Sequence, residues 1–286
     1  MAPRLGAAMF RRAMLTSTLR DLLGEHGPLA ERLVEEVRAD RGRLPVVFPG
    51  LPRRTARAPV GGGRKEFGDA LVDLDAFRVC DLVAAYLTTS INATADELID
   101  VFLHGDIEER AMLLRSLTFL PLGDATQRLM IEVLRTNIVL HLEAALCDHN
   151  LLTRAIRAGA VDNDTGNRLL LKFAFVDLPL RRAYGAEEQA SEELSRMLQD
   201  LATEREAAGR SVWRDTWRML GRAPCQGSLA RLIGGLEHGD DGVRHAAADG
   251  LLLLTERGAG IAHFAKERIP REPRPEIREL LERLSR

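Results

Sequence analysis

The sequence predicts an all-α protein, and three observations lead to this fold class. Aromatic residues make up only 5% of the 286 residues. The core must therefore be built from Leu, Ala, Val and Ile, a mixture that suits helices better than sheets. Apolar residues also recur at helical spacing along most of the chain. Charged helix starts followed by small apolar faces then indicate an irregular α-solenoid of antiparallel helix pairs, HEAT-like at its C-terminal end.

The helices can be assigned in order along the chain. The Arg-rich opening carries no acid before Asp21 and is predicted to be the first helix, with a transit peptide as the alternative interpretation. "TADE" from Thr94 is a capping box before an apolar run, so a helix is expected to begin there. The predicted helices are 8–24, 28–40, 75–89, 94–104, 106–119, 124–147, 164–176, 186–208, 211–221, 226–237, 240–256 and 274–285.

A recurring pattern, His-Gly followed by four residues and Arg, is predicted to mark junctions between helices. It begins at His26, His104 and His238. In the second copy the histidine suits the negative end of a helix dipole, and Gly105 is expected to be a left-handed terminator. Asp106 and Glu109 form a capping-box pattern for the next helix, and Arg110 is expected to meet Asp106 on one helix face. The pattern therefore indicates helix punctuation and not a catalytic signature.

Residues 41–68 are basic and rich in Pro and Gly, and they are predicted to form a long mobile loop. "LPVVFPG" resembles a strand, but Pro45 and Pro49 bracket it, so an extended loop is expected there. Such a loop could bind phosphates, acidic lipid headgroups or an acidic partner, or could simply be solvated. The predicted domains are 1–74, N-terminal helices plus this loop, 75–221, a helical core, and 222–286, a HEAT-like helical extension.

Composition limits the environment and the partners of the chain. The net charge of −2 gives no global attraction to nucleic acid, so no nucleic-acid partner is expected. Cys80, Cys147 and Cys225 are odd in number and far apart, which argues against a disulfide framework. No apolar run approaches the roughly 20 residues needed to span a bilayer, so no transmembrane segment is expected. These observations predict a cytoplasmic protein.

Two apolar helical segments carry polar residues that would need partners if they were buried. "RLMIEVLRTNIVLHLEAALCDHN" is apolar nearly all round, so one central and largely buried helix is expected. "NRLLLKFAFVDLPL" sets a lysine in an apolar run, where an isolated ammonium would be strongly disfavoured. The economical solution is a buried Glu143–Lys172 pair. The candidate cluster, either a structural tie or a ligand pocket, is Arg135, Asn137, Glu143, Asn167 and Lys172.

No catalytic constellation is recognisable in the sequence. Cys147, Asp148 and His149 are adjacent, so a helix would turn their side chains to different faces. "GGGRK" from Gly61 lacks the spacing of a phosphate-binding P-loop. We therefore assign no catalytic residue, no metal site and no cofactor, and we favour a non-enzymatic role.

Four segments carry a family resemblance: "LTFLPL" at 117–122, "RTNIVLHLEA" at 135–144, "NRLLLKFAFVDLPL" at 167–180 and "ATEREAAGRSVWRDTWRMLG" at 202–221. The chain resembles the EboA family, bacterial and plastid proteins encoded in the ebo gene cluster, over about residues 75–221. The chain has "CDHNLL" where that pattern leads us to expect an Asn-Pro turn. The positions that match the family pattern are Arg135, Asn137, Glu143, Asn167, Lys172 and Pro179.

The resemblance implies a part in moving or maturing secondary metabolites, and it carries over no catalytic residue. We therefore expect a non-catalytic adaptor that has protein partners, with other ebo-cluster proteins as candidates, and a small metabolite as a further candidate ligand. The alternative is a small-molecule-binding protein or an enzyme that uses a buried polar pocket around Glu143 and Lys172. Some relatives carry a sugar-phosphate isomerase label, which makes that reaction the example for the alternative.

Overall fold

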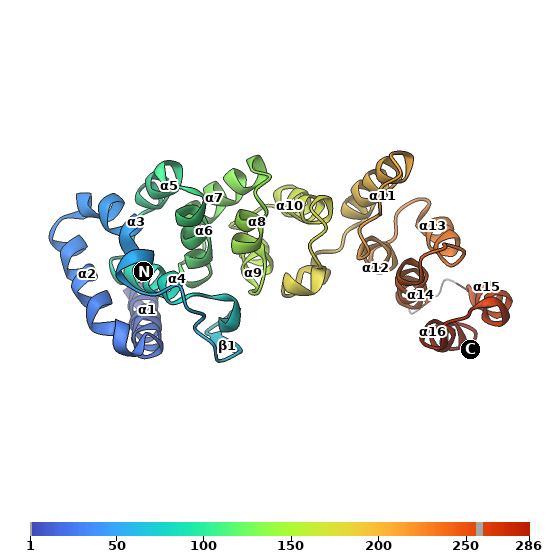
Figure 1. Ribbon diagram of the computed structural model, residues 1–286, viewed down its shortest axis with the longest axis horizontal. Coiled ribbons are helices and arrows are strands. Elements are labelled where there is room, and N and C mark those ends of the chain that lie inside the picture. The colour runs from blue at the N-terminus through green and yellow to red at the C-terminus, as the bar shows by residue number, and fades with distance from the viewer. Residues whose placement is uncertain (1, 256–259) are drawn as a thin grey trace. The chain divides into compact units, whose positions relative to one another are not determined.

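The computed structural model describes residues 2–255 and 260–286, and helices dominate it (Figure 1). The predicted all-α class is confirmed, with one small two-stranded sheet in the described part of the chain. The chain forms two compact units. The first comprises Met1–Thr165 with Arg182–Tyr184, and the second comprises Gly166–Arg181 with Gly185–Arg286.

The first unit is built around helix α4 (Val79–Ser90), in which every residue from Cys80 to Thr89 is buried. This burial follows from the sequence of α4, which is apolar on all faces apart from short polar groups. Helices α1, α2, α3 and α6 pack around α4, and α6 also packs against α8. The other helices of this unit are α1 (Ala2–Leu22), α2 (Gly27–Ala39), α3 (Leu44–Arg54), α5 (Ala95–His104), α6 (Ile107–Ser116), α7 (Asp124–Arg135), α8 (Val139–Leu146) and α9 (Leu151–Arg157).

Helix α3 corrects the prediction of a loop over residues 41–68. Its residues Leu44, Val47, Phe48 and Leu51 are all buried and are spaced as one helical face. Burial of this face against α4 and α5 outweighs the two prolines inside the helix, each of which removes a backbone hydrogen bond. The irregular connection that follows α3 is therefore much shorter than predicted.

A β-hairpin also lies where the loop was predicted. Strands β1 (Arg64–Phe67) and β2 (Ala70–Asp73) pair antiparallel across a two-residue turn, and its Gly68 has a φ of +67°. Glycine tolerates this left-handed conformation, which matches a tight hairpin turn to the strand twist. The polar side chain of Asn150 then binds the free edge of β2: Leu71 N donates to Oδ1 over 3.0 Å, and Nδ2 donates to Asp69 O over 2.9 Å.

The single buried helix predicted over 124–147 is wrong, because the chain breaks between α7 and α8. The Thr136 hydroxyl accepts a hydrogen bond from the backbone N–H of Ile138 over 3.1 Å. A hydroxyl that binds backbone two residues ahead competes with helical hydrogen bonding and favours a turn. The apolar residues on the two sides of the break thus belong to separate helices.

The second unit contains helices that pack mainly on α14 (Asp241–Thr255). Helices α12, α13 and α16 all contact α14, and the core includes Trp217, Leu232, Leu251 and Leu281. The other helices are α10 (Asn163–Phe175), whose first turn lies in the first unit, α11 (Glu192–Ala207), α12 (Thr216–Arg222), α13 (Ser228–Gly235), α15 (Ala262–Arg268) and α16 (Pro275–Leu284). The HEAT-like interpretation of residues 222–286, the solenoid arrangement and the three-part domain division stay predictions.

The His-Gly pattern does mark helix junctions, but its arginine acts differently from the prediction. Asp106 and Glu109 form the predicted capping box. Gly105 is extended and not left-handed. Arg110 donates to the carbonyls of Gly105 and Leu103, over 2.8 and 3.0 Å, and thereby binds the end of the preceding helix. In the third copy of the pattern the arginine likewise donates to the His and Gly carbonyls.

Helices α12 and α14 cross so closely that a prediction follows for Gly250. A Cβ atom at this position would lie 2.4 Å from the Trp217 carbonyl oxygen, and backbone cannot move aside as a side chain can. Gly250→Ala is therefore expected to lower the free energy of unfolding by about 1–3 kcal/mol. Gly234→Ala is the matched control, since no atom lies within 4 Å of its Cβ position. It should stabilise by about 0.4–1 kcal/mol. Urea unfolding of both variants, followed by tryptophan fluorescence, checks the opposite signs.

None of the described helices combines the length and the apolar character that crossing a lipid bilayer requires.

Candidate functional site

Three of the five predicted cluster residues lie in the first unit, and two of these three are on its surface. Arg135 ends α7, with a side chain that is 69% exposed and paired with Glu132 one turn earlier. Asn137 lies in the break after α7 and is also exposed. The predicted burial of these two residues is therefore wrong. They are exposed because the helix breaks after α7 and this segment turns towards solvent.

Glu143 is half-buried on α8, and the structure gives it Arg182 as its counter-ion. The same guanidinium holds Asp148 with two bonds, Nε to Oδ1 over 3.1 Å and Nη2 to Oδ2 over 2.5 Å. Asp148 adopts a φ of +65°, and its backbone N–H donates to the Arg182 carbonyl over 2.6 Å. Arg182 thus joins the end of α8 to the segment 182–184 by charge-assisted bonds of the bidentate kind.

Asn167 and Lys172 lie on α10 in the second unit. Asn167 is buried, and its Oδ1 accepts a hydrogen bond from the Ser191 hydroxyl over 3.4 Å. Lys172 is half-buried, and burial lowers the pKa of its ammonium because the charged form loses hydration. The pairing of Lys172 with Glu143 stays a prediction.

The adjacent Cys147, Asp148 and His149 do not form a catalytic group. Burial raises the pKa of the Cys147 thiol to about 12, so the thiol stays protonated and is a poor nucleophile at neutral pH. His149 is 1% exposed, and burial lowers its pKa to about 4. Its Nε2–H donates to the Ala144 carbonyl over 3.1 Å, while Nδ1 accepts from the N–H of Leu151 over 3.3 Å. Both ring nitrogens of His149 are therefore engaged in holding the loop.

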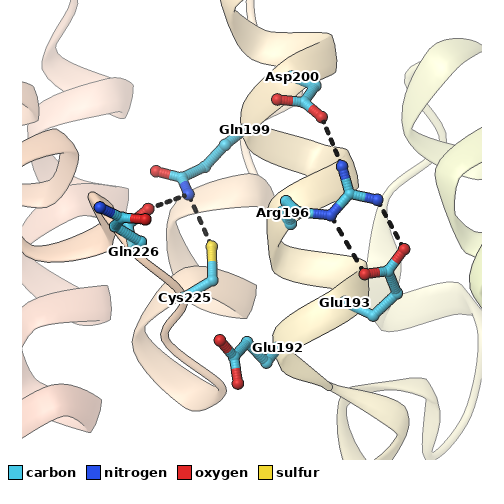
Figure 2. A pocket seen from close by; sticks show the side chains of 7 residues that line it. All are labelled: Glu192, Glu193, Arg196, Gln199, Asp200, Cys225 and Gln226. Atoms are coloured by element: carbon cyan, nitrogen blue, oxygen red, sulfur yellow. Dashed lines mark hydrogen bonds and ion pairs between the residues drawn. The ribbon is translucent and has the colours of Figure 1, made fainter.

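An acidic groove lies in the second unit, between α11 and the turn before α13 (Figure 2). Arg196 lies between Glu193 and Asp200, with Nη2–Oε1 and Nη1–Oδ2 distances of 2.7 and 3.1 Å. Gln199 reaches across the groove, and its Nε2 donates to the Gln226 carbonyl over 3.0 Å and contacts the Cys225 sulfur. The acidic groove has a volume of about 550 Å³, and its lining is Glu192, Glu193, Arg196, Gln199, Asp200, Cys225 and Gln226.

An apolar groove of about 560 Å³ adjoins the acidic groove, because Cys225 lines both. It is open to solvent, and Leu229 on its wall is 40% exposed. An exposed apolar surface with a polar rim is typical of interaction sites. Its lining is Pro224, Cys225, Gly227, Leu229, Ala230, Ile233 and Leu254. We call the two parts together the α11–α13 groove.

Comparison with known proteins decides the family. Residues 73–221 match the family model described as "Metabolite traffic protein EboA", which is more than half of the chain. The chain belongs to the EboA family. The predicted resemblance is thereby confirmed, over nearly the expected range. A search of curated proteins and a search of solved structures returned no significant match.

The EboA match begins at Asp73, the last residue of β2, and ends within α12, so it contains the Arg182 contacts and the acidic wall of the α11–α13 groove. Helices α1 to α3 and α13 to α16 lie outside it. Arg182 is not among the residues predicted from the sequence, although the segment 167–180 that resembles the family ends two residues before it. The signal that could have found it is the double arginine at 181–182, next to a buried Ala183 and a half-buried Tyr184.

Proposed function

We propose that this EboA protein is a non-catalytic adaptor that supports the processing or export of a secondary metabolite by holding a protein partner. The observation that carries the proposal is the α11–α13 groove, in which an acidic wall and an apolar wall meet at Cys225. The family description supports the link to metabolite traffic.

The chemistry of the groove defines the partner. Three acids, Glu192, Glu193 and Asp200, line the acidic wall, and the one guanidinium in the lining, that of Arg196, pairs with Glu193 and Asp200, so this wall keeps an excess of negative charge. The neighbouring wall is apolar and open. An amphipathic helix with a basic face and an apolar face would complement both walls at once, as helix-in-groove recognition requires. The proposed occupant is such a helix on another protein.

The chemistry of the family-matched segment supports a non-catalytic role. Arg182 pairs with both Glu143 and Asp148, which commits these carboxylates to a structural tie. Cys147 and His149 are buried in forms that neither attack a substrate nor gain a proton near neutral pH. These groups have the residue types of active sites but act here as supports for a loop.

The test is a partner-binding experiment with matched variants. The tagged protein is purified from its native host, each co-purifying protein is produced separately, and its Kd for the purified parent chain is measured. Leu229→Asp places a charge on the apolar wall, and Glu192→Lys reverses a charge on the acidic wall. Each variant is expected to raise the Kd for the partner at least about tenfold, which corresponds to a loss of roughly 1.4 kcal/mol of binding free energy. Leu103→Asp is the control, because Leu103 is 52% exposed but lies in the first unit.

The outcome separates the adaptor from its rival. A partner that binds through a basic amphipathic segment and responds to Leu229→Asp but not to Leu103→Asp supports the proposal. A partner that tolerates both groove variants contradicts it.

The rival function is a small-molecule-binding protein or an enzyme, for example sugar-phosphate isomerase-like, that uses Glu143 and Lys172. The lowered pKa of Lys172 is the observation that favours it, because desolvated lysines serve as bases and nucleophiles. Mass spectrometry of the purified protein tests it. A co-purifying metabolite that disappears in Lys172→Met, while the fold is retained, would support the rival.

A further inference from the structure

A basic cleft lies in the first unit, between helices α1, α2 and α4, well away in sequence from the α11–α13 groove. Its volume is about 560 Å³, within the range of small-molecule sites. It is walled by Arg12, Thr16, Ser17 and Arg20 from α1, Val34 and Arg38 from α2, and Tyr86 and Ser90 from α4. All of these side chains belong to the described part of the chain.

The charge of this cleft is strongly positive. Three arginines line it, and its lining contains no acid. Arg20 is neutralised by Glu31, with an Nε–Oε1 distance of 2.6 Å. Arg12 makes no ion pair among the residues that the structure describes, and Arg38 makes its hydrogen bond to a neutral carbonyl. Two positive charges therefore converge on one concave surface, which attracts an anion.

Two of the arginines are held in place before any ligand arrives. The guanidinium of Arg20 lies against Gly27, where a Cβ atom would come within 1.8 Å of Nη1. Glu31 fixes the other side of the same group. Nη2 of Arg38 donates to the Ser90 carbonyl over 2.8 Å. A guanidinium has five N–H donors in a fixed fork, so Arg38 can hold this carbonyl and an anion together.

The remaining walls define the rest of the ligand. Ser17 brings a hydroxyl group to the cleft, and hydroxyls bind phosphate oxygens alongside arginine. The Thr16 hydroxyl donates to the Arg12 carbonyl of its own helix over 3.0 Å. Val34 and Tyr86 supply an apolar wall; both are buried, and Tyr86 is 9% exposed. A ligand that carries one phosphate group and a small apolar body would fill both parts.

We propose that this cleft is a binding site for a small organic phosphate, with Arg12 and Arg38 holding the phosphate oxygens and the wall of Val34 and Tyr86 contacting the organic part. The planar fork of arginine matches the oxygens of phosphate and forms paired, charge-assisted hydrogen bonds. This site is independent of the proposed adaptor function, because its residues lie in the other unit from the α11–α13 groove.

The experiment is calorimetric titration of the full chain with phenyl phosphate and with inorganic pyrophosphate. Binding to the parent is expected, and it should weaken as salt is added. Arg12→Gln and Arg38→Gln should each raise the Kd for phenyl phosphate at least about tenfold, since each removes a charge-assisted contact. Arg53→Gln is the control, because Arg53 is an exposed arginine outside the cleft. The affinity of Arg53→Gln for phenyl phosphate should equal that of the parent. Phenol, which lacks the phosphate, should not bind.

Three results would overturn the proposal. One is the absence of binding of both phosphate probes to the folded parent. Another is equal affinity in Arg12→Gln, which is the decisive variant because Arg12 makes no ion pair whose loss could unfold the cleft. The third is binding only to vesicles of phosphatidylcholine mixed with phosphatidic acid, which would assign the cleft to a lipid headgroup. Loss of partner binding at the α11–α13 groove would leave these outcomes unchanged.

Discussion

Glu272→Gln is expected to lower the free energy of unfolding of the second unit by about 3–5 kcal/mol, because it removes the buried counter-ion that two buried arginines share. Among the described residues, Arg244 then keeps only Asp241, and Arg268 keeps only Glu237, and both of these acids are partly or largely exposed. Glu272 is 2% exposed. Its Oε2 lies 2.9 Å from Nε of Arg244 and 3.0 Å from Nη2 of Arg268. Both arginines are themselves nearly buried, at 5% and 8% exposed. The substitution keeps the shape of the side chain, so the change isolates its charge.

Tryptophan fluorescence during urea unfolding measures this effect, because both tryptophans, Trp213 and Trp217, are buried in the second unit. Glu279→Gln is the matched control: Glu279 is exposed on α16, so its substitution should change the free energy by less than about 0.5 kcal/mol. Equal unfolding midpoints for the two variants would show that the Glu272 charge contributes nothing.

The pH dependence gives the same prediction a second readout. Burial by itself would raise the pKa of Glu272, but hydrogen bonds from Arg244 and from the Arg274 backbone outweigh it and lower the pKa below its usual 4.5. A carboxyl with a lowered folded-state pKa stabilises the protein above its unfolded-state pKa, and this stabilisation is lost as the pH falls through the folded-state pKa. The difference between parent and Glu272→Gln should therefore be full at pH 7 and should shrink as the pH falls below about 4.5.

Helix positions were predictable where the local signals agreed with one another. The capping box at Thr94 and the pattern at Asp106 fixed the starts of α5 and α6, because each satisfies backbone donors by residues close in sequence. Helix α3 could not be predicted in this way. Its prolines indicate a loop, and only the burial of Val47 and Phe48 against α4 and α5 explains a helix there. Tertiary packing decided against local propensity.

The candidate site was predictable only in its residue types. The sequence showed that Glu143 would need a positive partner, and it offered forty basic residues to choose from. Arg181 and Arg182 have identical chemistry, yet only Arg182 binds Glu143 and Asp148. The choice depends on the direction of the backbone at 182–184, where Ala183 pairs with His149. No periodicity in the sequence records a contact of this kind.

Buried ion pairs were missed for a related reason. Asp81 stands at the third position of α4, where an acid is most simply interpreted as a favourable charge at a helix start. The structure shows a second role beside this one: Asp81 accepts a hydrogen bond from the Arg78 N–H at the helix start, but its side chain is also 0% exposed and is bound by two arginines. A buried ion pair is thus hidden here within an ordinary helix-capping pattern.

Asp81→Asn is accordingly expected to lower the free energy of unfolding of the first unit by about 3–5 kcal/mol. Arg78 holds Asp81 through Nη2–Oδ1 and Nε–Oδ2 contacts of 3.0 and 3.1 Å. Arg115 lies 3.6 Å away, and its buried Nη1 atom has no hydrogen-bond partner, so it depends on the carboxylate charge. Asparagine keeps the shape but removes that charge, which takes from Arg115, 15% exposed, the carboxylate beside it. In the described part of the chain, Arg78, 22% exposed, then keeps only its ion pair with Glu108.

The matched comparison is Asp96→Asn, which also breaks an Asp–Arg pair. Asp96 lies 2.7 Å from Arg128, but its side chain is 90% exposed, and exposed ion pairs contribute about 0–1 kcal/mol. Hydrogen exchange of peptides from α4 and α6 reports the opening of the first unit separately from the second. Faster exchange in Asp81→Asn than in Asp96→Asn is the expected result. Equal exchange in the two variants would mean that solvent reaches Asp81, and that burial does not strengthen its pairing with Arg78 and Arg115.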